Sequence, residues 1–332
     1  MKLVTYTLQE VASPRFGMKK GDYIVDVLRA AIWAKTQKNQ SEFLEIPTSL
    51  KKALGNWNHN LPQLQRLFEI IPDTNLNSYT ANERPLAFDE SDVILLPPVP
   101  DLAAFRNFNA FEQHMLATRR LQGLEKDSLW YEIPVFYYSN PGTFYGHRAE
   151  IPYPTGTDEL DFGLEWAVII ANGGKNISRE EADLVIGGFT ILNDWSARDW
   201  QRKEMRLNLG PAKGKDFATS AGPYLVTPDE LADRRNGEKF NLNMTCHVNG
   251  NLLSSGNTND LYHSFAAMIE RAGRNTPLLP GDYIGSGTVG TGCILELRPE
   301  NTGGWLKPGD VVSLTIERLG TLENKITEPD FL

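Results

Sequence analysis

The sequence contains little cysteine and no long apolar run. Its 332 residues include two cysteines, Cys246 and Cys293, and neither belongs to a CxxC pair. This excludes a disulfide framework and a thiolate zinc site, and it is typical of a reducing compartment. The N-terminal residues lack the apolar core of a signal peptide, and no stretch has the length of a membrane span. We therefore expect a cytoplasmic protein without a membrane partner.

Basic residues are also in deficit. The chain has 33 lysines and arginines against 42 aspartates and glutamates, for a formal net charge of -9. Nucleic acids are bound by basic surfaces, so we expect no nucleic-acid partner. Five histidines occur, and none forms an HExxH pattern typical of zinc enzymes. With 41% hydrophobic and 23% charged residues, the composition is that of an ordinary globular protein.

The residue pattern predicts two parts. In residues 1–95, strand-like segments at 2–8 and 22–27 precede helix-like segments at 27–38 and 61–71. The proline-rich segment 94–100 is typical of a linker, because each proline fixes φ and removes a backbone donor. We predict a small N-terminal α+β domain over 1–95 and a larger domain over 96–332.

Strands outnumber helices in the second part. Asn249 and Gly250 separate two strand-like segments, which is a strong hairpin signal. Pro-Gly-Asp turns at 280–282 and 308–310 each precede a strand-like segment. This antiparallel spacing argues against a doubly wound parallel sheet and predicts an α+β fold that is predominantly β.

Two acidic residues are candidate metal ligands. Glu165 shares a face with Asp161 in the alternating segment 160–170, and Asp194 follows the apolar segment 185–192. Carboxylate oxygens are the ligands that Mg²⁺ and Ca²⁺ prefer. From spacing alone, the plain interpretation is favoured by roughly three to one: Glu165 is a solvated strand residue, and Asp194 caps a helix that starts at Ser196.

Two further segments contain candidate substrate-binding groups. If LNDWSARDWQ (192–201) is helical from Ser196, Arg198 and Gln201 share a face and suit a dicarbonyl or carboxylate substrate. The alternative is an ordinary charged surface helix. In LGPAKGKDF (209–217), Lys215 can offer an ammonium to a developing enolate. No Ser or Thr follows this lysine, which argues against a nucleotide-binding loop.

The remaining signals are weaker. His114 lies in a helix-like segment that Asn109 and Glu112 are expected to open as a capping box. A lone histidine is more often structural than catalytic, by roughly two to one. The glycine-rich turn GSGTVG (285–290) precedes Glu296, and it is either a tight loop or a site where Thr288 approaches a ligand.

Together and in order, these segments resemble the fumarylacetoacetate hydrolase family over about residues 95–320. They are RNFNAFEQH (106–114), PVFYYSNP (134–141), residues 160–165, LNDWSARDWQ, LGPAKGKDF and GSGTVG. The resemblance implies a mixed β-roll catalytic domain after a smaller N-terminal domain, usually in a homodimer. It also implies cleavage of a carbon–carbon bond next to a ketone, in a 1,3-dicarbonyl, acylpyruvate or fumarylacetoacetate-like 2-oxo acid.

The resemblance also implies roles for individual residues. His114 matches the general base that activates water, and Glu296 the carboxylate that orients it. Lys215 matches a group that stabilises the enolate. Glu165 and Asp194 match two metal ligands. Four further positions match substrate contacts: Tyr145, Arg198, Gln201 and Thr288.

Three positions depart from the family pattern. Asn107 stands where the family has an aspartate, and Gly163 where it has a glutamate, so two of four anionic metal ligands are lost. Asn107 offers only a neutral amide oxygen, and charge count sets the affinity of such sites. We expect a weakened Mg²⁺ or Ca²⁺ site with Glu165, Asp194 and Asn107 as ligands. Met205 replaces a tyrosine, which makes one wall of the pocket apolar.

Three hypotheses for function follow, weighted roughly five, three and two in ten, because a shared fold does not determine function. The first is a carbon–carbon hydrolase with a weakly held metal. The second is a relative with altered, metal-independent isomerase or lyase chemistry. The third is a non-catalytic relative that binds a ligand.

Overall fold

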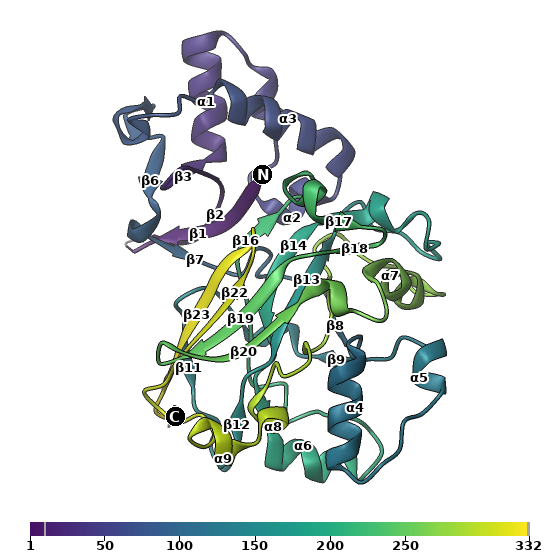
Figure 1. Ribbon diagram of the computed structural model, residues 1–332. Helices are drawn as coiled ribbons and strands as arrows, with labels where there is room; N and C mark the ends of the chain where they lie inside the picture. Colours follow the sequence, from purple (N-terminus) through teal and green to yellow (C-terminus); the bar gives the residue numbers. More distant parts are fainter. Residues whose placement is uncertain (10, 331–332) are drawn as a thin grey trace.

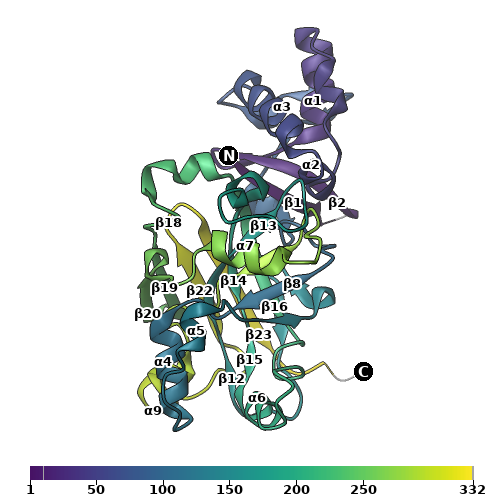
Figure 2. The ribbon, with the colours of Figure 1, turned by 90° about the vertical axis from the view of Figure 1, so that its right-hand side faces the viewer.

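The computed structural model describes residues 1–9 and 11–330, and two sheets dominate it (Figures 1 and 2). In the described residues the larger sheet has 12 strands, ten of them in the order β6-β3-β2-β1-β16-β14-β13-β21-β8-β9, while β10 pairs with β16 and β7 with β1. Its strands are β1 (Lys2–Leu8), β2 (Val11–Lys20), β3 (Tyr23–Asp26), β6 (Ala87–Asp89), β7 (Val93–Leu95), β8 (Phe105–Phe108), β9 (Phe136–Ser139), β10 (Phe144–Tyr145), β13 (Leu164–Ile170), β14 (Ile186–Asn193), β16 (Thr219–Val226) and β21 (Tyr283–Gly285).

The smaller sheet has the order β11-β23-β22-β19-β20. Its strands are β11 (Glu150–Pro152), β19 (Asn243–Val248), β20 (Asn251–Asn257), β22 (Val311–Ile316) and β23 (Gly320–Thr327). Three two-stranded pairs complete the described strands: β4 (Thr80–Ala81) with β5 (Arg84–Pro85), β12 (Leu160–Asp161) with β15 (Ser196–Ala197), and β17 (Arg235–Asn236) with β18 (Lys239–Phe240). The expected α+β fold, predominantly β, is confirmed.

The helices gather at the two ends of the molecule and beside the sheets (Figures 1 and 2). They are α1 (Val27–Lys38), α2 (Leu50–Leu54), α3 (Trp57–Ile70), α4 (Glu112–Leu121), α5 (Leu129–Glu132), α6 (Arg198–Met205), α7 (Phe265–Gly273), α8 (Ile294–Leu297) and α9 (Pro299–Thr302). Helix α1 begins where predicted because the Asp26 side chain accepts a hydrogen bond from the Arg29 amide, and it ends at Asn39, whose φ of 56° is left-handed. None of the described helices is long and apolar enough to cross a membrane.

The N-terminal strands continue the sheet of the rest of the chain. Strand β1 pairs with β16, with Leu3 opposite Leu225, and β7 at the start of the expected linker pairs with β1. The helices α1 and α3 nevertheless stand apart at one end of the molecule (Figure 1). The boundary at residue 95 stays a prediction.

The central strands are buried on both faces. Every residue of β13, β14 and β16 is buried, and Trp166 stacks on Phe189 in the core between the sheets and α7. The alternation in 160–170 therefore does not separate a core face from a solvent face, and Glu165 is only 1% exposed. The predicted hairpin at Asn249 and Gly250 is confirmed, with φ of 51° and 80° and with β19 paired to β20.

Because β1 belongs to the main sheet, a core substitution there should affect the whole molecule. Leu3 is fully buried, so Leu3→Ala should cost about 2–5 kcal/mol in a single unfolding transition followed by circular dichroism in urea. The control Leu28→Ala, at a side chain that is 40% exposed, should change stability by less than about 0.5 kcal/mol. Two separate transitions, of which Leu3→Ala shifts only one, would contradict this view.

Candidate active site

A cavity of about 330 Å³ lies at the ends of the central strands. It brings together side chains from segments far apart in the sequence. The lining includes nine residues that the sequence analysis names: Asn107, His114, Glu165, Asp194, Arg198, Gln201, Met205, Lys215 and Thr288. Tyr145 is not among the lining residues; it packs on the core from β10. The tyrosine that lines the cavity is Tyr137 of β9.

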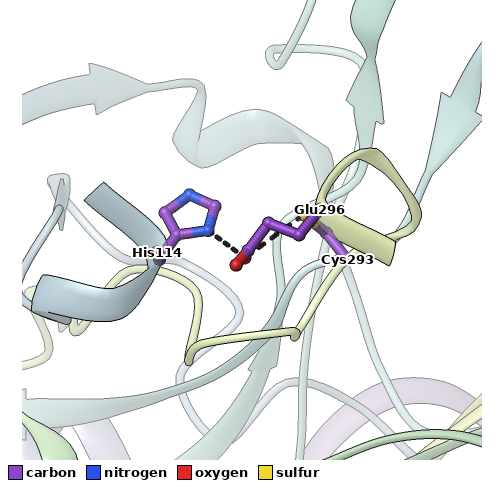
Figure 3. Close-up of side chains that lie close together, drawn as sticks. All are labelled: His114, Cys293 and Glu296. Carbon is purple, nitrogen blue, oxygen red and sulfur yellow. Dashed lines mark hydrogen bonds and ion pairs between the residues drawn. The ribbon is translucent and has the colours of Figure 1, made fainter. Parts of the chain in front are cut away.

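His114 and Glu296 form a dyad at the wall of the cavity. The Glu296 carboxylate hydrogen-bonds to Nδ1 of His114, and the two side chains point toward each other from α4 and α8 (Figure 3). Oε2 of Glu296 accepts the Thr291 amide at 3.0 Å, and the thiol of Cys293 lies 3.7 Å from Oε1. Glu296 therefore orients the ring and, as a carboxylate, favours the tautomer with the proton on Nδ1, which leaves Nε2 as the base.

The same contacts keep Glu296 ionised. Burial by itself raises the pKa of this carboxyl, but the hydrogen bond and charge of His114, together with the Thr291 amide, lower it below its ordinary value overall. The imidazolium that forms after proton uptake therefore lies beside a carboxylate.

Helix α4, which carries His114, does not begin with the expected capping box. Its first flanking residue is Phe111, whose side chain has no acceptor to cap the helix and whose backbone forms a β-bridge with Leu261. Glu112 instead accepts a hydrogen bond from the Tyr131 hydroxyl at 2.6 Å. The position of α4 is therefore set by tertiary pairing rather than by local capping.

Asp161 connects Arg198 to the His114–Glu296 dyad. Its Oδ2 accepts Nε of Arg198 at 2.8 Å, and its two oxygens accept the amides of Ile294 and Leu295 at 2.7 and 3.0 Å, at the start of the helix that carries Glu296. Nη1 of Arg198 donates to Gln201 at 2.9 Å, so the expected pairing of these two residues is present. Helix α6 starts at Arg198 rather than Ser196, because Ser196 and Ala197 form strand β15, which pairs with strand β12.

One donor of Arg198 remains available. Its Nη2 is buried without a hydrogen-bond partner in the described part of the chain. Arginine presents its donors in a planar fork that matches a carboxylate. The group is thus a candidate for binding an acidic substrate.

Glu165 and Asp194 are buried beside each other. The interpretation of Glu165 as a solvated strand residue and of Asp194 as a helix cap is wrong. Asp194 does not cap a helix: its Oδ2 accepts the Tyr137 hydroxyl at 2.5 Å and the ammonium of Lys215. Glu165 is not solvated: its Oε1 accepts Thr288 Oγ1 at 2.9 Å. Burial and the charge of Asp194 raise the pKa of Glu165.

Asn107 lies between these carboxylates. Its Nδ2 donates to Oε2 of Glu165 at 2.9 Å and to Oδ2 of Asp194 at 3.2 Å. Its Oδ1 accepts the amide of Gly287 at 3.2 Å. Because a backbone amide only donates, this contact determines which end of the Asn107 side chain faces the carboxylates.

The fumarylacetoacetate (FAA) hydrolase C-terminal family model matches residues 103–327. The chain belongs to this family. It is 33% identical over 193 residues to a mitochondrial oxaloacetate tautomerase of Homo sapiens, which is 58% of this chain and 59% of that protein. It thus matches less than two thirds of the human relative's length.

Two further comparisons cover nearly the whole chain. An oxaloacetate tautomerase of Bacillus subtilis is 29% identical over 306 residues, 91% of this chain and 94% of that protein. The structure of a maleylpyruvate hydrolase from Sphingobium sp. SYK-6, in complex with manganese(II) ion and pyruvate, has a TM-score of 0.68 at 19% identity, covering 99% of this chain and 100% of that chain. The family thus includes enzymes with hydrolase and tautomerase names, and one neighbour binds a divalent metal.

The side chains of this chain fit such a metal only poorly. Asn107 turns its donor end to the carboxylates, Gly163 has no side chain, and the ammonium of Lys215 already balances one of the two negative charges. Hard divalent cations need about six or more oxygen ligands. In the described residues, Oδ1 of Asp194 is the one oxygen of these two carboxylates that is buried without a partner. The expected Mg²⁺ or Ca²⁺ site with Glu165, Asp194 and Asn107 as ligands stays a prediction, and in the described residues these side chains form a hydrogen-bonded centre.

The connection through Asp161 predicts a stability effect. Asp161→Ala leaves Arg198 buried without its charge partner and should cost about 3–5 kcal/mol of unfolding free energy, measured by urea titration. As a matched control, Glu159→Ala removes the partner of the exposed Arg202 and should cost less than about 1 kcal/mol. Equal costs for the two variants would show that Asp161 does not hold this part of the site.

The side chains at positions 107 and 163 predict how Mn²⁺ affinity changes when carboxylates are introduced there. Wild type should bind Mn²⁺ weakly, and Asn107→Asp combined with Gly163→Glu should bind it roughly tenfold or more tightly, measured by isothermal titration calorimetry. A Cβ at Gly163 would lie 3.2 Å from Oε1 of Glu165, so the new side chain reaches the centre after a shift of a few tenths of an ångström. Asn109→Asp adds one such negative charge to the cavity wall away from these carboxylates and should change Mn²⁺ affinity little. Tight Mn²⁺ binding by wild type would contradict the assignment.

Proposed function

We propose that the protein catalyses the keto–enol tautomerisation of a small 2-oxo acid or 1,3-dicarbonyl, with His114 as the base. The observation that supports this most directly is the His114–Glu296 dyad in the wall of a cavity that also contains Arg198 and Lys215. Related enzymes carry tautomerase names, including one whose match covers most of this chain. Proton transfer needs a positioned base and a group that stabilises the enolate, and His114 and Lys215 can supply them.

The steps follow from the side chains. Arg198 binds the substrate carboxylate through its free Nη2, while Gln201 holds the guanidinium in place. Nε2 of His114 takes the proton from the carbon next to the ketone, and Glu296 stabilises the imidazolium. The ammonium of Lys215 stabilises the enolate oxygen, and the imidazolium returns the proton at oxygen or carbon.

A second candidate is hydrolysis of a carbon–carbon bond, the function predicted from the sequence. It is favoured by the position of His114, which lines the cavity and is 13% exposed, so that a water molecule can reach its ring. The dyad would then activate that water for attack on a carbonyl, and the enolate of pyruvate would be the leaving group. The partner in either case is a small acidic molecule. The homodimer and the cytoplasmic location stay predictions.

The role of His114 is tested by substitution. His114→Ala should lower kcat on oxaloacetate enol or an acylpyruvate by roughly 10²–10⁴-fold, and Glu296→Gln by less, with unchanged unfolding midpoints. His59→Ala, at an exposed histidine of α3, serves as control and should keep full activity. Turnover of the His114→Ala variant at the wild-type rate would refute the proposal.

Parallel assays separate the two reactions. Tautomerisation changes the ultraviolet absorbance of the enol without releasing pyruvate, whereas hydrolysis releases one pyruvate for each acylpyruvate consumed. Pyruvate release in step with the absorbance change would favour hydrolysis. Ligand-induced stabilisation with neither signal would instead support a non-catalytic binding role.

A further inference from the structure

The cavity around His114 opens into a second, larger space. A cleft of about 660 Å³ shares Asn109, His114, Arg198, Gln201 and Met205 with the inner cavity. Helix α4 lines it from one side and α6 from the other, at the end of the molecule away from the N-terminal helices (Figures 1 and 2). We call the part lined by Thr118, Leu121, Gln122, Arg202, Arg206 and Leu295 the outer cleft.

The outer cleft is larger than a small 2-oxo acid requires. The inner cavity, at about 330 Å³, is already at the lower end of the volumes of small-molecule sites. The buried Glu165 and Asp194 line the inner end, and the outer cleft offers a substituent of the substrate space past His114 and between the two helices. The outer cleft thus continues the path that a substrate takes away from the dyad.

The lining of the outer cleft is mixed, with Leu121 and Leu295 beside polar and basic side chains. Most of its exposed surface comes from apolar atoms, and no acidic residue lines it. Leu121 and Met205 are 46% and 44% exposed and offer apolar surface to a ligand. Arg202 and Arg206 also line the cleft, and the guanidinium of Arg202 is paired with Glu159.

We infer that the substrate is a 2-oxo acid with a long apolar acyl substituent, which lies in the outer cleft against Leu121 and Met205. This inference rests on the proposed function, because it places the ketonic acid head at Arg198 and His114. The substituent then leaves the inner cavity between α4 and α6. A small dicarboxylate such as oxaloacetate would fill the inner cavity alone.

The test is a series of acylpyruvates from acetyl- to octanoylpyruvate, with both absorbance change and pyruvate release measured. Each added methylene that enters the outer cleft should raise kcat/KM roughly fourfold, until the cleft is filled. Leu121→Asp should lower the hexanoyl-to-acetyl ratio of kcat/KM by roughly tenfold or more. The matched control Leu124→Asp, at a side chain that is 50% exposed and outside the cleft, should leave that ratio unchanged.

The outcomes are distinguishable. A ratio that rises along the series, falls in Leu121→Asp and persists in Leu124→Asp supports the inference. Turnover of acetylpyruvate with no gain for longer chains, or an equal loss in both variants, overturns the inference and leaves the proposed function standing. Absence of turnover with every member of the series and with oxaloacetate enol overturns the proposed function and this inference with it.

Discussion

The carboxylate of Asp161 is the contact on which the arrangement of the reaction centre depends. It is fully buried, and it accepts hydrogen bonds from Arg198 and from the two amides that begin α8. Helix α8 carries Glu296, which in turn orients His114. Arg198, proposed to bind the substrate acid, and His114, proposed to move its proton, are thus both held through one negative charge. Such a buried carboxylate is stable only while all its donors remain in place.

The second constraint is the charge balance at the inner end of the cavity. Glu165 and Asp194 would repel each other in a buried site without compensation. Asn107 bridges them with one amide group, Tyr137 and Thr288 donate hydroxyl groups, and Lys215 supplies a positive charge. In the described residues these donors balance the two carboxylates. The ammonium of Lys215 pairs with Asp194 and also lines the cavity.

Much of the fold could be predicted from local chemistry. The bounds of α1 follow from Asp26 and Asn39, and the hairpin at Asn249 and Gly250 follows from two residues that tolerate positive φ. Family membership was predicted from the order of six short segments and is confirmed by the match over residues 103–327. In each case the decisive signal lies within a few neighbouring residues.

The features that were missed depend on contacts between distant segments. Tyr137 enters the centre because β9 pairs with β8 and places it opposite Asn107, a register that no local pattern specifies. Glu165 looked solvated because alternation predicts one exposed face, yet β13 is covered on both sides. The pairing of β1 with β16 joins residues more than 200 positions apart. Likewise, the orientation of Asn107 is decided by the Gly287 amide, which only the folded chain brings near.

The central claim is that this centre forms an enolate with its own side chains. The most direct measurement is the exchange of the C3 protons of a 2-oxo acid with deuterium oxide, followed by nuclear magnetic resonance in excess EDTA. The account predicts that wild-type protein accelerates the exchange in EDTA and that His114→Ala does not. Exchange at the background rate in EDTA, restored by added Mn²⁺, would contradict it.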